Sequence, residues 1–316
     1  GMGEVQLVHD QVVGRDVALK VLDLMLHLQP DAVRRFLREA RIQGQLEHPA
    51  IVPVHDLGFT PEGRAYFTMK RVRGRTLQDI LEQLERGVPE VQQAYSRRKL
   101  LTAFSSVCLA VELAHSRGVL HRDLKPANVM LGEYGEVYVL DWGVAKAKGA
   151  TTEIPDGPAA PRDGETAAGA LLGTLGYMPP EQVDGGGAAV DHRADIYALG
   201  VMLFELLVLQ PLHPRAPAME LIAGTLAGAD ARASVRAPER DVPPELEAIC
   251  VRATATAPRS SRTRSPASRP RCRRPRSAAP PSSRPSVSRP RRRPRPASRR
   301  ARRRPRPRAR APPPRP

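Results

Sequence analysis

Features of disulfide-bonded and membrane-spanning proteins are scarce in this sequence. Its three cysteines, Cys108, Cys250 and Cys272, are odd in number and far apart, which argues against a disulfide framework and favours a reducing compartment. No Cys-x-x-Cys pair or His/Cys cluster suggests a zinc site. No apolar run approaches the ~20 residues that a bilayer span needs, and the N-terminus lacks the basic-then-apolar pattern of a signal peptide. We therefore expect a cytoplasmic protein without a membrane segment.

Charge divides the chain into two unequal parts. Residues 253–316 contain 23 arginines, no lysine and no acidic residue, whereas residues 1–252 carry 27 basic against 33 acidic residues, a net charge of −6. The overall charge of +17 therefore describes neither part. A DNA-binding interpretation drawn from the whole-chain charge would be misleading.

Ionisable and amide side chains gather in the run from His121 to Asn128, His-Arg-Asp-Leu-Lys-Pro-Ala-Asn. A second acidic turn, Asp141-Trp142-Gly143, follows thirteen residues after Asn128. The first run resembles the catalytic loop H-R-D-L-x-x-x-N of protein kinases, and the second resembles their D-F-G turn with Trp in place of Phe. Either run alone could be a charged surface turn. The two motifs occur together at the spacing that protein kinases show, which favours the kinase interpretation.

The resemblance implies a division of chemical work. Phosphoryl transfer depends mainly on positioning and on charge held ready for the transferred group. By resemblance, Asp123 would accept the proton of the substrate hydroxyl, and Lys125 would neutralise the γ-phosphate of ATP. Asn128 and Asp141 would hold Mg²⁺, which prefers hard oxygen ligands. A lysine two positions after the aspartate is the form found in Ser/Thr-directed kinases.

The N-terminal segment resembles part of the kinase glycine-rich loop, G-x-G-x-x-G-x-V. Gly3 and Val5 align with the last glycine and the valine, so the first two glycines and the first strand are expected to be missing. Residues 5–8 and 16–22 are predicted to form strands. Lys20 closes Val-Ala-Leu-Lys, which resembles the V-A-I-K strand whose lysine pairs with the α- and β-phosphates.

After this strand, apolar residues recur at helical spacing and predict a helix with Asp31 as its N-cap. They are Val33, Phe36, Leu37 and Ala40. Glu39 occupies the position where kinases place the glutamate that pairs with this lysine. A solvated helix glutamate is the alternative, but Lys20 favours the ion pair.

Further residues align with the family's nucleotide pocket. Ala18 and Val5 would lie above the adenine ring and Met130 below it. Met69, at the end of a predicted strand 65–69, would stand at the back of the pocket or serve as a core methionine. The backbone around Arg71 would form the hinge that meets adenine.

Regulation is expected in residues 143–173, which lack periodicity and resemble an activation segment. Arg122, directly before the catalytic aspartate, resembles the arginine through which related kinases sense a phosphate on that segment. Thr166 is the leading acceptor, ahead of Thr151 and Thr152. Thr174 would hydrogen-bond to the catalytic loop.

The remaining segments are predicted to be helical. A stripe in residues 96–117 indicates a buried helix closed by Gly118. Residues 195–207 are apolar on nearly all sides, as in a fully buried helix, and Asp195 is expected from the resemblance to anchor the catalytic loop. Residues 244–252 resemble the penultimate kinase helix, and the last one is expected to be missing.

The tail after residue 253 contains 16 prolines and no leucine, isoleucine, methionine or aromatic residue, so we expect it to be disordered. It could bind nucleic acid or another polyanion, although it has no aromatic residue to stack on bases. It could be a regulatory extension. The interpretation that the composition favours is a shifted reading frame in GC-rich DNA.

Together these features predict an α+β, bilobal fold that resembles bacterial eukaryotic-like serine/threonine protein kinases. The N-lobe would span residues 1–72 with a small antiparallel sheet, the mainly helical C-lobe residues 73–253, and the tail residues 254–316. The expected activity transfers the γ-phosphate of ATP, with Mg²⁺, to protein Ser or Thr hydroxyls, including its own. The alternatives are a catalytically impaired, pseudokinase-like nucleotide-binding scaffold and polyanion binding through the tail.

Overall fold

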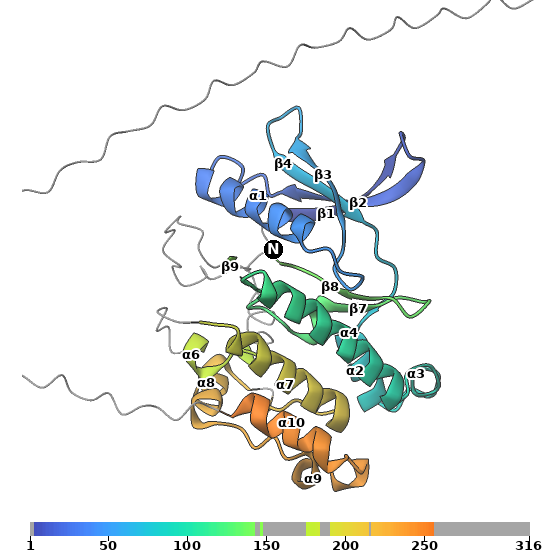
Figure 1. The fold of residues 1–316 in the computed structure, drawn as a ribbon, viewed down its shortest axis with the longest axis vertical. Helices are drawn as coiled ribbons and strands as arrows, with labels where there is room; N and C mark the ends of the chain where they lie inside the picture. Colours follow the sequence, from blue (N-terminus) through green and yellow to red (C-terminus); the bar gives the residue numbers. More distant parts are fainter. Residues whose placement is uncertain (1–2, 143–145, 148–174, 184–189, 215, 256–316) are drawn as a thin grey trace, which may run out of the picture. The chain divides into compact units, whose positions relative to one another are not determined.

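The computed structural model describes residues 3–142, 146–147, 175–183, 190–214 and 216–255. Figure 1 shows a sheet with one long helix at one end of this part, and a mainly helical body at the other. The bilobal, α+β architecture expected from the kinase resemblance is therefore confirmed. No helix among the described residues is long and apolar enough to cross a membrane.

The smaller lobe is built on four antiparallel strands in the order β1-β2-β4-β3. Their bounds are β1 Gly3–Asp10, β2 Arg15–Leu22, β3 Val54–Phe59 and β4 Ala65–Lys70. Residues in β2 alternate little because its second half is buried on both faces. The register sets Lys20 opposite Val5 on one side and Phe67 on the other.

Helix α1, Pro30–Gln45, packs on this sheet through the predicted apolar stripe. The rings of Phe36 and Phe67 lie 5.2 Å apart, and both side chains are fully buried. The prediction of Asp31 as N-cap is wrong. The helix begins at Pro30, whose backbone suits the first helical position, and Asp31 lies in the first turn, where it pairs with Arg34.

Residues 71–74 connect β4 to the larger lobe, where β5, Arg75–Thr76, leads into α2, Leu77–Glu85. The Thr76 hydroxyl accepts a hydrogen bond from the backbone N–H of Asp79 at 3.0 Å and caps α2.

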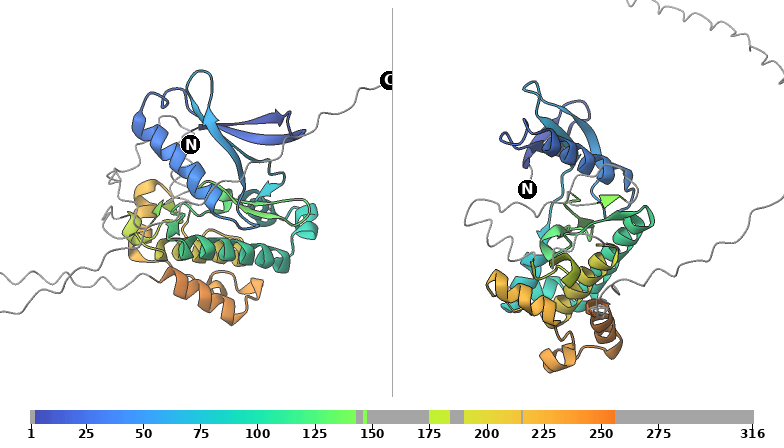
Figure 2. Two further views of the ribbon diagram at one scale, coloured as in Figure 1. Left: turned by 45° about the horizontal axis from the view of Figure 1, so that its top comes forward. Right: turned by 90° about the vertical axis from the view of Figure 1, so that its left-hand side faces the viewer.

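Two long helices form the centre of the larger lobe. They are α4, Arg97–Ser116, and α7, Arg193–Val208, and α10, Pro244–Thr254, packs on the outer side of α7 (Figure 2). Gly200 allows that close packing, because a Cβ there would come within 2.5 Å of the Ala253 Cβ. The three predicted helices are confirmed. Gly118 is not itself the C-cap of α4; Arg117 is, and Gly118 follows it with φ of 73°.

Short elements complete the larger lobe and present the loop between His121 and Asn128. Strand β7, Val129–Leu131, pairs with β5 on one side and with β8, Val137–Val139, on the other, and β6, Val119–Leu120, pairs with β9, Lys146–Ala147. The other elements are α3 Pro89–Ala94, η1 Pro126–Asn128, α6 Pro180–Val183, α8 Ala218–Ala227, α9 Ala233–Arg236 and η2 Pro238–Arg240.

Candidate active site

The loop from His121 to Asn128 is held from below by a buried carboxylate on α7. Asp195 accepts the backbone N–H groups of His121 at 2.9 Å and Arg122 at 2.7 Å, and contacts His115 Nε2 at 2.7 Å. Burial alone would raise the pKa of Asp195, but these hydrogen bonds and nearby positive charge lower it. Arg122 has φ of 66°, a left-handed conformation that is costly for a residue with a Cβ. The ionised Asp195 therefore holds the loop in a strained shape.

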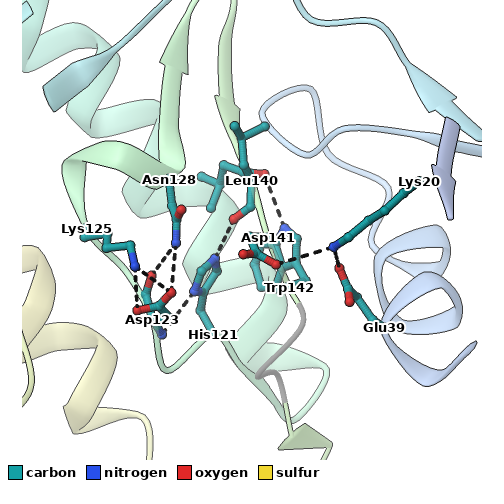
Figure 3. A network of polar contacts seen from close by, with 10 residues as sticks. Lys20, Glu39, His121, Asp123, Lys125, Asn128, Leu140, Asp141 and Trp142 are labelled. Carbon is teal, nitrogen blue, oxygen red and sulfur yellow. Dashed lines mark hydrogen bonds and ion pairs between the residues drawn. The ribbon is translucent and has the colours of Figure 1, made fainter. Parts of the chain in front are cut away.

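Three polar side chains converge within this loop (Figure 3). Lys125 Nζ lies 3.0 Å and 3.2 Å from the two carboxylate oxygens of Asp123. The Asn128 amide donates to the Asp123 backbone carbonyl at 2.8 Å and to its carboxylate at 3.2 Å. This assignment leaves the amide oxygen of Asn128 as an additional acceptor. A single turn of η1 brings the three groups together because it folds the chain back between positions 126 and 128.

The turn at Asp141 is anchored by a tryptophan that is fully buried. The Trp142 ring has 0% exposure, and its Nε1 donates to the Val139 carbonyl at 3.3 Å. It packs edge-on against the His121 ring at 4.7 Å. His121 Nδ1 accepts the backbone N–H of Asp123 at 3.3 Å and its Nε2 faces the Leu140 carbonyl at 3.0 Å, which assigns the ring proton to Nε2. Trp142 therefore ties the acidic turn to the catalytic loop.

A buried ion pair connects β2 with α1 at the same site. Lys20 Nζ lies 2.5 Å from Glu39 Oε1 and 3.7 Å from Asp141 Oδ1 (Figure 3). Burial raises the pKa of Glu39 even though Lys20 opposes that shift. Burial also opposes ionisation of Asp141, but the surrounding positive charges, Lys20 foremost, outweigh it and lower the pKa of Asp141. The predicted partnership of Lys20 and Glu39 is present in the structure.

The side chain of Asp141 is half exposed, so its carboxylate can be reached from solvent. Among the described residues, no three His, Cys, Asp or Glu side chains cluster as a metal site. One carboxylate together with the Asn128 amide oxygen suits Mg²⁺, which usually binds through one or two protein carboxylates, waters and substrate phosphates. The donor set therefore fits a magnesium–nucleotide complex rather than a metal enclosed by protein ligands.

The residues expected to surround the nucleotide base lie on strands of two sheets. Ala18 is paired with Met69 across β2 and β4, and Met130 lies on β7 opposite Tyr138. The Arg71 side chain pairs with Asp16 at 2.8 Å. The role expected at this position belongs to the backbone and does not involve that side chain.

Gly3 and Val5 lie on β1. A Cβ on Gly3 would come within 2.3 Å of the Val21 carbonyl oxygen, so packing between strands by itself requires glycine there. Val5 is more than half exposed.

Several predicted residues lie outside the described residues. They are Gly143, Thr151, Thr152, Thr166, Thr174 and Cys272. Arg122 is described, and its backbone carbonyl accepts a hydrogen bond from Gln182 Nε2 at 3.2 Å.

Two contacts near the site were not predicted from the sequence. His115 on α4 supports Asp195, and Lys70 at the end of β4 bonds to the hydroxyl of the buried Tyr138 on β8. The Lys70 Nζ also lies 4.9 Å from the centre of that ring. These pairs are separated by 80 and 68 positions, so no local pattern could have revealed them.

Comparison with known proteins agrees with this geometry. Residues 1–254 match the family model of the protein kinase domain. The chain is 38% identical over 267 residues to the serine/threonine-protein kinase PknD of Chlamydia pneumoniae, an alignment that covers 82% of this chain and 28% of the relative. It is 40% identical over 222 residues to PknD of Protochlamydia amoebophila, covering 66% of this chain and 22% of that protein.

The chain thus spans less than a third of the length of these relatives. The family model, by contrast, extends from the β1 segment through α10 and includes every side chain of the polar site described above. The chain belongs to the protein kinase domain family.

Proposed function

We propose that this chain is a protein serine/threonine kinase that transfers the γ-phosphate of ATP to Ser or Thr side chains of proteins. The observation that carries the proposal is the joint placement of Lys20, Glu39 and Asp141 in one chain of contacts, beside the cluster of Asp123, Lys125 and Asn128. The relatives are serine/threonine-protein kinases by name, and a lysine lies two positions after Asp123; both observations support Ser/Thr specificity.

In this mechanism the substrate hydroxyl oxygen attacks the γ-phosphorus as the bond to the β,γ-bridging oxygen breaks and ADP leaves. The hydroxyl proton passes to the carboxylate of Asp123, which Lys125 and Asn128 orient from two sides. Lys125 carries a positive charge toward the transferred group. Lys20, positioned by Glu39, holds the α- and β-phosphates.

Asn128 and Asp141 would hold Mg²⁺, which would neutralise charge on the phosphate oxygens. The pKa of Asp141 is lowered, so its carboxylate is ionised at neutral pH, as a metal ligand must be.

We further propose that Gly3, Val5, Ala18, Met69 and Met130 line the nucleotide site. The backbone at Arg71 would meet the adenine edge, since residues 71–74 form the connection between the lobes. The lobe boundary then lies near residues 72 and 73.

Regulation would act through Arg122, which lies next to the catalytic aspartate and whose backbone Asp195 holds. Thr166 is the proposed phosphate acceptor, and Thr174 the proposed partner of the catalytic loop.

The test incubates the full chain with labelled ATP, Mg²⁺ and a generic basic protein, followed by phosphoamino-acid analysis. We expect phosphoserine and phosphothreonine, and a loss of about 10²- to 10⁴-fold in turnover for Asp123→Asn. Asp56→Asn, an exposed aspartate on β3, is the matched control. Equal turnover in Asp123→Asn and wild type would refute the assigned role. Trp142 is the only tryptophan in the sequence and directly follows Asp141, so we expect a change in its fluorescence to report nucleotide binding without turnover.

A further inference from the structure

Two adjoining surface hollows run along the outer face of α4, apart from the catalytic loop. One has a volume of about 320 Å³ and lies between the first half of α4 and the β7–β8 hairpin. The other is a shallow, open stretch of surface that continues along α4. Both are lined by Arg98 and Thr102, so they form one elongated depression, which we call the α4 groove.

The groove combines an apolar floor with a basic rim. Leu131 and Val137 line the first hollow and are almost fully buried, and Leu101 lines the second. Arg98 and Lys99 are exposed at its edge. Glu136 is the acidic residue in this lining, and its carboxylate accepts the backbone N–H of Tyr134 at 3.1 Å, so the lining holds two cations against one anion. The rim is therefore positive over a surface that can accept apolar groups.

These cations are not explained by helix stability. The first turn of α4 contains no acidic residue, and basic side chains gain nothing from the positive end of a helix dipole. Lys99 donates to the Ala94 carbonyl at 3.0 Å and covers the Tyr95 ring at 4.8 Å. Within the described ranges, Arg98 has no ion-pair partner. Its charge is available to a partner from outside.

We propose that the α4 groove docks an acidic segment of the protein substrate, with an apolar side chain seated against Leu131 and Val137. This proposal rests on the proposed kinase activity. Charge complementarity selects the occupant, because carboxylates match the rim. It also argues against the chain's own residues 253–316, which carry 23 arginines and no acid. The elongated shape suits an extended peptide better than a compact small molecule.

The groove's position sets a spacing requirement on the substrate. Thr102 lies fourteen residues before Ser116 at the end of α4, a rise of about 21 Å at about 1.5 Å per residue. An extended peptide covers about 3.3 Å per residue, so about seven or more residues should separate the docked segment from the phosphorylated hydroxyl. Docking there would raise the effective concentration of the acceptor without touching the catalytic groups.

The first experiment measures binding by fluorescence anisotropy, using the full chain and a labelled ten-residue peptide of aspartates with two leucines. We expect Arg98→Glu to weaken binding about tenfold. Thr102→Tyr, which fills the groove without changing charge, should weaken it about as much. Both positions are exposed, and a glutamate in the first turn of α4 favours the helix. Arg252→Glu, an exposed arginine on α10, is the matched control and should stay within about twofold of wild type.

A second peptide, with glycines in place of the leucines, separates groove binding from simple charge attraction to the arginine-rich tail. We expect it to bind about tenfold more weakly than the leucine peptide. If both peptides bind equally well, or if Arg252→Glu weakens binding as much as Arg98→Glu, the groove is not the docking site.

Kinetics then connect docking to turnover. A serine acceptor joined to the acidic segment by ten residues should show a lower KM than the acceptor alone, and Arg98→Glu should remove that advantage without changing kcat on the acceptor alone. An advantage that survives Arg98→Glu would overturn the proposal. Because anisotropy needs no turnover, an inactive chain that still binds the leucine peptide would refute the kinase proposal while leaving docking supported.

Discussion

Replacing Glu39 by Gln tests how the buried pair with Lys20 serves the site. The substitution keeps the shape of the side chain and removes its charge. Glu39 is 3% exposed, and its carboxylate is 2.5 Å from Lys20 Nζ, whereas Asp141 is 3.7 Å from the same nitrogen. The lysine therefore has a second carboxylate to which it can move.

The distances give the size of the effect. At an effective dielectric constant of about 20, the attraction of Lys20 to Glu39 at 2.5 Å is about 7 kcal/mol, and a move of the ammonium from 3.7 Å to 2.5 Å from Asp141 would recover about 2 kcal/mol of it. Burial already raises the pKa of Glu39, so part of this attraction is offset by the cost of desolvating the carboxylate. We therefore expect Glu39→Gln to lower the free energy of unfolding by no more than about 5 kcal/mol.

Activity should fall together with stability. Once Lys20 moves toward Asp141, it is displaced from the phosphates and occupies an oxygen proposed for Mg²⁺. We expect turnover to fall on the order of 10²-fold. Urea unfolding followed by Trp142 fluorescence gives the stability, and initial rates with labelled ATP give the turnover. Glu47→Gln, an exposed glutamate just beyond α1, is the control. Turnover within about threefold of wild type would refute this account of the pair.

Three further predictions follow from buried groups elsewhere. Asp195→Asn should lower the free energy of unfolding by about 3 kcal/mol, because charge-assisted bonds to the catalytic loop are lost, and chemical denaturation measures the loss. Burial lowers the pKa of His213, which lies 2.9 Å from the Tyr197 hydroxyl, so the fold favours the neutral ring. Wild type should thus lose stability as pH falls below about 6.5, where the unfolded chain takes up the proton; His213→Gln should flatten that slope, and an unchanged slope would contradict the assignment. Burial raises the pKa of Cys108 to about 11 and of Cys250 to about 12, so both should resist iodoacetamide at pH about 8 until the protein is unfolded, as mass spectrometry would show.

Much of the candidate site could be predicted from short stretches of sequence. Asp123, Lys125 and Asn128 fall within six positions, and the single short turn of η1 brings them together. Helix periodicity likewise predicted the segments of α1 and α4, an apolar run predicted α7, and the kinase resemblance predicted α10. The errors fell at helix ends: Pro30 takes the first position of α1 and displaces Asp31 from the capping role.

Tertiary structure decided the rest. The 2.5 Å contact between Lys20 and Glu39 depends on how α1 packs against β2, and the hold of Asp195 on the catalytic loop joins residues more than 70 positions apart. The α4 groove exists only because the β7–β8 hairpin lies beside the first half of α4. Periodicity indicates which face of a helix or strand is buried. The element against which that face packs depends on contacts between distant residues throughout the core. The sequence by itself therefore determined the chemistry that the chain can perform, and packing determined which distant groups meet to perform it.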